Sequence, residues 1–131
     1  NGESQGCDDS QPETVFPAVA AALSDLGIGF LELREPGTDG SFGRTDVPKQ
    51  SPAIRKVFKQ ALVLNSDLTV DSGQALLDMD AADAISFGRS FMANPDLPRR
   101  FKEGLPLNAI KAPPTWYAQD SVGYTDYPFA S

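Results

Sequence analysis

The chain has 131 residues, of which 40% are hydrophobic, and its formal net charge is -7 at pH 7. With 11 basic against 18 acidic residues, it lacks the positive charge that binds nucleic acid or an anionic membrane surface. Histidine is absent, which excludes the commonest general base, the Ser-His and Cys-His nucleophile pairs and the usual zinc ligand. We therefore predict no nucleic-acid partner, no membrane partner and no metal site.

We do not expect residues 1–10 to form a targeting signal. Residues 1–10 are polar, unlike a signal peptide, and no apolar run is long enough to cross a bilayer. Cys7 is the single cysteine, which excludes an internal disulfide framework, and its neighbours Asp8 and Asp9 disfavour a reactive thiolate. These features predict a soluble, cytoplasmic protein.

The first half of the chain reads as helix, strand and loop. Ser10 stands at capping-box spacing from Glu13, and apolar residues follow at helical period as far as a stop at Gly27. A short apolar strand is expected over residues 28–33. The segment 37–50 contains three glycines and mixed charge, which predicts an irregular loop.

The second half repeats this order. The Ser51-Pro52 pair opens a short helix through residue 58, and residues 61–64 read as a buried strand. Thr69 is placed to cap a helix that runs to about residue 79, weakened by Gly73. A third strand is expected over residues 83–87.

A last helix and an irregular tail complete the expected elements. Asn94-Pro95 opens a helix that ends near Gly104, and proline, glycine and aromatic residues dominate from Leu105 onward. Strands that alternate with helices favour parallel pairing through right-handed crossovers. The predicted fold class is therefore α/β.

Two loops point to a phosphorylated ligand. Asn65-Ser66 follows the second strand, and Gly88-Arg89 follows the third. A glycine allows close backbone approach, and a guanidinium fork matches phosphate oxygens. In barrels of eight βα units, the phosphate site commonly lies on the loops after the last two strands. Only three strands can be counted, so the chain reads as part of a larger barrel.

The residues that carry a family resemblance are Ala-Ile-Ser-Phe-Gly-Arg at 84–89, Asn-Pro-Asp-Leu at 94–97, Trp-Tyr at 116–117 and Gly-Tyr-Thr-Asp-Tyr-Pro at 123–128. Together they closely resemble the C-terminal part of the Old Yellow Enzyme family, which are FMN-dependent ene-reductases on a TIM barrel. The resemblance covers essentially residues 1–131 as a single segment. It implies about three βα units, barrel strands six to eight, that do not form a complete domain alone.

The resemblance also implies a cofactor site. Arg89 and the Gly88 amide would hold the FMN phosphate, with Asn65 and Ser66 lining the same cradle. The family often has Gly-Asn where this chain has Asn65-Ser66, so the backbone amides are the surer contacts there. Two plainer interpretations stay open: a surface Arg89 paired with Asp96, and Asn65 as a simple turn former.

Three aromatic residues are implied at the rim of the flavin and substrate: Tyr117, Trp116 and, on the long loop, Phe42. Tyr117 and Trp116 could instead be core aromatics, and Phe42 could pack within its loop. We assign Tyr124 and Tyr127 to packing.

By resemblance, the complete enzyme oxidises NAD(P)H through FMN and delivers hydride to the β-carbon of an activated alkene, an α,β-unsaturated carbonyl compound. The groups that polarise the carbonyl precede this segment in the family, so no catalytic residue is expected here. An N-terminal barrel segment would complete the enzyme. Two alternatives stay open: a barrel fragment that acts on sugar phosphates, and a non-catalytic half-barrel that serves as a phosphate- or flavin-binding or assembly module.

Overall fold

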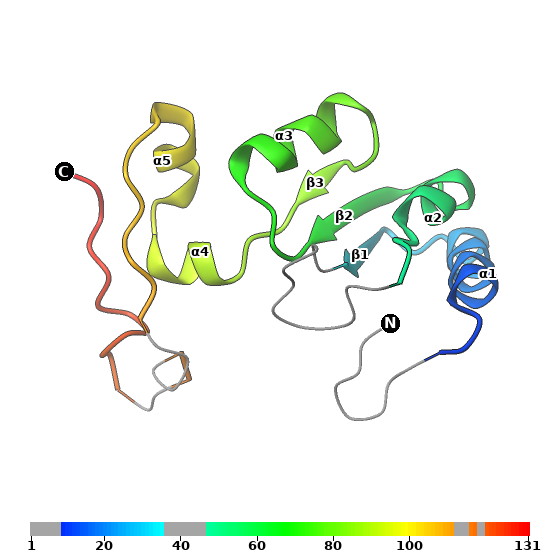
Figure 1. Cartoon of the computed structure of the whole chain (residues 1–131), viewed down its shortest axis with the longest axis horizontal. Coiled ribbons are helices and arrows are strands. Elements are labelled where there is room, and N and C mark those ends of the chain that lie inside the picture. The colour runs from blue at the N-terminus through cyan, green and yellow to red at the C-terminus, as the bar shows by residue number, and fades with distance from the viewer. Residues whose placement is uncertain (1–8, 36–46, 112–115, 118–119) are drawn as a thin grey trace. The chain divides into compact units, whose positions relative to one another are not determined.

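The computed structural model of the chain describes residues 9–35, 47–111, 116–117 and 120–131 (Figure 1). The chain divides between Ser86 and Phe87 into two compact units. We call residues up to Ser86 the sheet unit and residues from Phe87 onward the tail unit. Each is described by itself.

The first helix, α1, spans Pro12–Asp25. Its N-cap is Gln11, whose side chain makes no capping bond, so the capping box predicted from Ser10 is wrong. Proline suits the first helical turn because its missing N–H has no helical acceptor there. The predicted stop at Gly27 is confirmed: its φ is 72°, and the N–H of Ile28 bonds back to the carbonyl of Leu23, which closes a Schellman motif.

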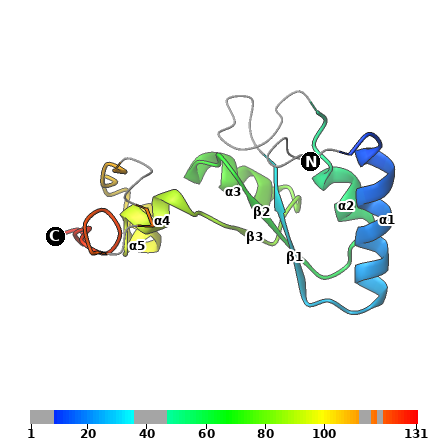
Figure 2. The same ribbon diagram turned by 90° about the horizontal axis from the view of Figure 1, so that it is seen from below.

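Three strands form a parallel sheet in the order β1-β2-β3. They are β1 (Phe30–Arg34), β2 (Ala61–Asn65) and β3 (Ala84–Ile85), joined through α2 (Ser51–Val57) and α3 (Val70–Asp78). The third strand is shorter than predicted, but parallel pairing and the α/β class are confirmed. Figures 1 and 2 show each strand followed by its helix.

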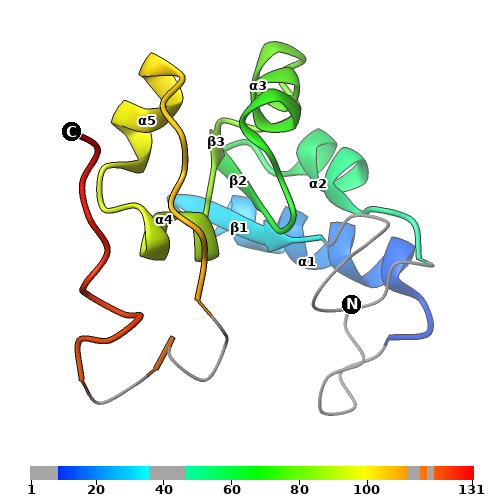
Figure 3. The same ribbon diagram turned by 60° about the vertical axis from the view of Figure 1, so that its left-hand side comes forward.

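The core of the sheet unit lies between β2 and the helices. Leu62 and Leu64 are buried on one face of β2. The same core cluster contains Ile54 of α2, Phe58 directly after α2, and Ala20 of α1. Figure 3 shows α1 running beside α2. Because side chains alternate along a strand, Ala61, Val63 and Asn65 stand on the opposite face, away from this core.

The N-terminus of α2 is capped from another element. The sequence analysis made Ser51 the cap, whereas Ser51 is the first helical residue. The carboxylate of Glu35, just after β1, accepts hydrogen bonds from the N–H groups of Gln50 and Ser51. The carboxylate satisfies N–H groups that have no helical acceptor.

The helix α3 begins as predicted. Thr69 is its N-cap and forms a reciprocal capping box with Ser72. Gly73 is explained by packing, because a Cβ at this position would lie 3.3 Å from Cγ1 of Ile85 on β3. The glycine lets helix and strand approach closely.

In its described residues the tail unit contains two short helices, α4 (Arg89–Ala93) and α5 (Leu97–Glu103). The sequence analysis missed α4. It placed the start of the next helix at Asn94-Pro95, whereas the N-cap is Asp96. The end at Gly104 is confirmed, with a φ of 64°. In the described residues after Glu103 no further helix or strand occurs, which confirms an irregular tail.

Candidate functional site

Polar side chains gather at the carboxyl edge of the sheet. Arg34 at the end of β1 is in register with Asn65 at the end of β2. The Asn65 side chain donates to Oε1 of Glu32 at 2.8 Å and lies 3.4 Å from the hydroxyl of Ser86. Leu31 and Leu33 pack on the core, so Glu32 and Arg34 stand on the other face of β1. The strand alternation could have revealed this pair, which the sequence analysis overlooked.

The turn after β2 has an unusual backbone. Ser66 and Asp67 have φ values of 84° and 53°, in the left-handed region that favours glycine. Such residues cost on the order of 1 kcal/mol each. The Ser66 N–H donates to Oδ1 of Asn65 at 2.6 Å, which helps to hold this conformation. The turn predicted from Asn65 is present, but its strained backbone was not predicted.

A small hollow of about 30 Å³, partly open to solvent, lies at the same edge. Its lining is Glu35, Lys49, Ser51, Leu64, Asn65, Leu68 and Leu76. Ligand pockets commonly hold about 300–1,000 Å³. The hollow is therefore far too small to enclose a flavin.

In the tail unit, Gly88 is the N-cap of α4 and Arg89 is its first residue. A Cβ at Gly88 would meet nothing within 4 Å among the described residues, so a ligand could approach the backbone there. Arg89 is half-buried. Gly88 and Arg89 lie in the tail unit. Asn65 and Ser66 lie in the sheet unit, so the four predicted phosphate residues are divided between the two units.

Asp96, the alternative partner suggested for Arg89, is engaged by other groups. Its Oδ1 accepts from Nε of Arg100 at 2.7 Å, and its Oδ2 accepts from the N–H of Ala130 at 2.8 Å. The Arg100 guanidinium, followed by the Ala130 N–H, holds the pKa of the Asp96 carboxyl below its ordinary value despite an opposing effect of burial. This ion pair is buried on both sides.

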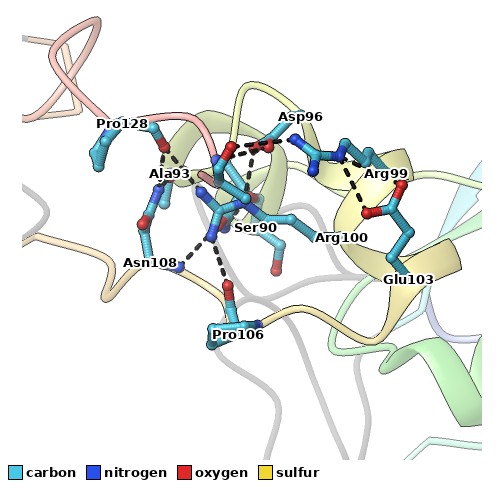
Figure 4. A network of polar contacts seen from close by, with 11 residues as sticks. Ser90, Ala93, Asp96, Arg99, Arg100, Glu103, Pro106, Asn108 and Pro128 are labelled. Carbon is cyan, nitrogen blue, oxygen red and sulfur yellow. Dashed lines mark hydrogen bonds and ion pairs between the residues drawn. The ribbon is translucent and has the colours of Figure 1, made fainter.

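Arg100 continues this polar network into the tail (Figure 4). Its Nη1 donates to the carbonyl of Pro106. Its Nη2 donates to the carbonyl of Pro128 at 2.9 Å. The Asn108 side chain donates to the same Pro128 carbonyl, and the backbone N–H of Asn108 donates to Oδ1 of the fully buried Asn94. The sequence analysis did not find this network, because its partners lie in segments without periodicity.

The predicted rim aromatics differ in exposure. Tyr117 is 89% exposed, so it is not part of the core that this chain forms, whereas Trp116 is half-buried and donates from its indole N–H to the carbonyl of Lys111 at 2.8 Å. Tyr127 is 7% exposed, so its packing role is confirmed. Tyr124 is 47% exposed, so it packs only in part. Phe42 lies outside the described residues.

The described residues limit the chemistry of the site. Nowhere among them do three or more histidine, cysteine, aspartate or glutamate side chains come together as a group that could hold a metal ion. None of their helices is both long enough and apolar enough to span a bilayer. The donors that they do offer, guanidinium, hydroxyl and amide N–H groups, suit an anion.

Comparison with known proteins identifies the family. No family model matches the chain, but over 98% of its length it is 60% identical to the solved Old Yellow Enzyme homologue from Zymomonas mobilis, with a TM-score of 0.92. The chain belongs to the Old Yellow Enzyme family. It covers 36% of that homologue, so it is a C-terminal segment of about three βα units of the TIM barrel of this family, as predicted.

Two further relatives agree. The chain is 41% identical to a 12-oxophytodienoate reductase-like protein of Solanum lycopersicum, over 95% of this chain and 33% of the relative. It is 39% identical to morphinone reductase, with a TM-score of 0.84, over 94% of this chain and 32% of that one. The chain thus spans about a third of the length of the relatives that it matches. These family members are oxidoreductases.

Proposed function

We propose that this chain supplies the FMN-phosphate end of an NAD(P)H-dependent ene-reductase that reduces α,β-unsaturated carbonyl compounds. The observation that carries the proposal is the 60% identity to an Old Yellow Enzyme homologue over nearly the whole chain. A morphinone reductase of similar fold has been solved with tetrahydroNAD, which supports a nicotinamide as the reductant. FMN, when bound, would accept a hydride from the nicotinamide and pass it to the alkene.

Two loops of the chain are assigned to the phosphate in this proposal. In the sheet unit, Asn65 and Ser66 follow β2, and in the tail unit Gly88 and Arg89 open α4. In barrels of eight βα units the loops after the last two strands commonly hold a phosphate, which supports the assignment of Asn65, Ser66, Gly88 and Arg89 to the FMN phosphate.

Each residue would contribute a different kind of contact. Arg89 supplies a charge-assisted fork for the phosphate oxygens, and Gly88 supplies an N–H without a Cβ in the way. Ser66 offers its hydroxyl from a turn whose left-handed backbone is typical of functional loops. Arg34, in register with Asn65, adds a cation at the same edge of the sheet.

Tyr117 and Trp116 form the substrate rim in this proposal. A nearly fully exposed tyrosine beside a tryptophan that is hydrogen-bonded to Lys111 offers an aromatic surface for a flat, conjugated substrate. Phe42, outside the described residues, stays a predicted rim residue. By resemblance, the groups that polarise the substrate carbonyl precede this segment, so the catalytic groups would come from the rest of the barrel.

The partner of the chain would be the complementary N-terminal barrel segment. Among the described residues, β1 pairs with β2 alone, so its other edge is available for a further strand. Large apolar side chains are exposed on α1 and at the entry to β1: Val15, Val19, Leu26, Ile28 and Phe30. Residues 1–131 would thus form one part of a domain, inactive alone. We place the assembled enzyme in the cytoplasm, which suits a chain with a single cysteine.

The test is to combine this chain with a polypeptide that carries barrel strands one to five, titrate FMN by fluorescence and measure NADPH-dependent reduction of cyclohexenone. Arg89→Ala should weaken FMN binding roughly ten- to a hundredfold, because a hydrogen bond to a charged group contributes about 1.5–3 kcal/mol. The matched control is Arg99→Ala, which removes a guanidinium paired with Glu103 on α5.

Three outcomes count against the proposal. Turnover by the lone chain would refute the need for a partner. An FMN affinity that does not change in Arg89→Ala would remove Arg89 from the site. An assembled protein that binds FMN but reduces no alkene would favour the non-catalytic flavin-binding module.

A further inference from the structure

All three polar groups of Lys111, its N–H, its carbonyl and its ammonium group, contact later residues of the tail unit. Its backbone N–H donates to the hydroxyl of Tyr127 at 2.9 Å, and its carbonyl accepts the indole N–H of Trp116 at 2.8 Å. Its ammonium group lies 2.7 Å from Oδ2 of Asp126 and 5.4 Å from the centre of the Tyr127 ring. A single residue thus links the indole of Trp116 to a later part of the tail.

The two side chains that contact Lys111, Asp126 and Tyr127, are fixed by contacts of their own. Oδ1 of Asp126 accepts the N–H of Gly123, whose φ of 77° suits a glycine-dependent turn. The ring of Tyr127 is buried, so its hydroxyl is presented to Lys111 from a fixed position. We call Lys111, Asp126 and Tyr127 the tail neck.

Tyr117 is exposed, whereas Tyr127 of the tail neck is buried. Tyr117 follows Trp116 directly and is almost fully exposed, although a buried aromatic ring would be more stable. An exposed aromatic side chain next to an anchored one is ready to contact a ligand, because less conformational entropy is lost when it binds. Tyr124 is also exposed, but its hydroxyl makes no hydrogen bond to any residue that the structure describes.

We propose that Lys111, Asp126 and Tyr127 are positioning residues, which hold Trp116 and Tyr117 in place at the substrate rim. The inference rests on the proposed function, because the rim belongs to it. None of the three needs to touch the substrate. Asp126 and Tyr127 hold Lys111, and the Lys111 carbonyl accepts the hydrogen bond of the indole. A small displacement of a substrate contact can reduce the rate strongly.

The experiment uses the assembled, flavin-loaded barrel with 5-fluorotryptophan in this chain alone. Trp116 is the only tryptophan of the 131 residues, so one ¹⁹F resonance reports on it. Tyr127→Phe removes only the hydroxyl acceptor, and Tyr124→Phe is the matched control. Lys111→Met removes the ammonium group without touching the buried ring, and Lys111→Arg should restore the ion pair.

We expect Tyr127→Phe and Lys111→Met to shift or broaden the Trp116 resonance. Each should raise KM for the alkene roughly two- to tenfold, the range of one ordinary hydrogen bond, with smaller changes in kcat. Bound FMN per protein should stay unchanged, and Lys111→Arg and Tyr124→Phe should behave as wild type. A raised KM with unchanged FMN content distinguishes a positioning role from a general loss of structure.

Other results overturn the inference. If both variants keep the wild-type resonance and KM while the barrel binds FMN and reduces alkenes, only the positioning role fails. If both variants lose FMN together with activity, the tail neck is structural. If the wild-type assembly binds no FMN, the proposed function and this inference fail together.

Discussion

Different interactions stabilise the interior of the sheet unit and the interior of the tail unit. In the sheet unit the completely buried side chains Phe58 and Leu62 are apolar. In the tail unit the buried set includes Asn94, Asp96 and Arg100, which bond to other side chains and to backbone carbonyls. The tail unit also buries the apolar side chains of Ala93 and Leu97. It thus adds a set of buried directional hydrogen bonds to its apolar contacts.

The difference follows from how each backbone is satisfied. Strands and helices pair their own N–H and C=O groups, so side chains between them are free to be apolar. The tail after α5 has no ladder, and its carbonyls at Pro106 and Pro128 instead accept from Arg100. An irregular segment can thus be ordered by a few polar residues. Losing one of them leaves several partners unsatisfied at once.

The largest effect should come from the apolar core. Phe58→Ala should reduce the free energy of unfolding by about 3–5 kcal/mol, because the substitution leaves a cavity under β2. Urea denaturation of the assembled barrel measures the loss. Phe129→Ala is the control, since this ring is largely exposed and its removal should cost less than about 0.5 kcal/mol. Equal losses would contradict an apolar core centred on Phe58.

The next effect should come from the polar anchor. Asn94→Ala removes the acceptor of the Asn108 N–H and the donor to the Ser90 carbonyl, each bonded at 2.8 Å. We expect a loss of about 1–3 kcal/mol, the cost of unsatisfied buried groups. Faster hydrogen exchange should be confined to the tail unit.

The matched amide control is Gln74→Ala. Its side chain bonds to Asp78 on the surface of α3 and should contribute only a few tenths of a kcal/mol. If Asn94→Ala is as mild as this control, the tail does not depend on its buried polar groups.

Acid should destabilise both units. The pKa of Asp96 lies below its ordinary value of 3.8, chiefly because of Arg100. The stability from this pair is therefore complete above pH 3.8 and is lost as the pH falls below it through the folded pKa. The lowered pKa of Asp83 in the sheet unit, due first to the Leu62 N–H and then to Arg55, predicts the same direction there.

Salt should distinguish these two carboxylates. Asp83 is half exposed, whereas Asp96 is buried, so added salt should weaken the acid response of the sheet unit more than that of the tail unit. Hydrogen exchange of peptides from each unit, corrected for the intrinsic pH dependence, measures the acid response of each unit with and without added salt. An equal salt effect on the two units would contradict this assignment.

The smallest effect concerns Gly73. Gly73→Ala gains about 0.5–1 kcal/mol of helix propensity but brings a methyl group to 3.3 Å from Ile85, so the net change should be close to zero. In an Ile85→Ala background the same substitution should become stabilising by that amount. A double-mutant cycle in urea denaturation measures the coupling, and additive effects would show that the close approach has no energetic cost.

The sequence alone determined the elements whose signals are local. The alternation of helices and strands, the Thr69 cap and the glycine stops at Gly27 and Gly104 all depend on residues within one or two turns of each other. The Gly88-Arg89 pair was found in the same way, because it follows an apolar run directly. Such signals can be read without knowing the fold.

Only the tertiary structure decided the contacts that join distant residues. Glu35 caps a helix that begins 16 residues later, and Arg100 bonds to a carbonyl 28 residues away. The same is true of Lys111 with Asp126 and Tyr127, which stand 15 and 16 residues further on. These partners meet only after the chain has turned back on itself, and an irregular chain has no hydrophobic period that predicts where it returns.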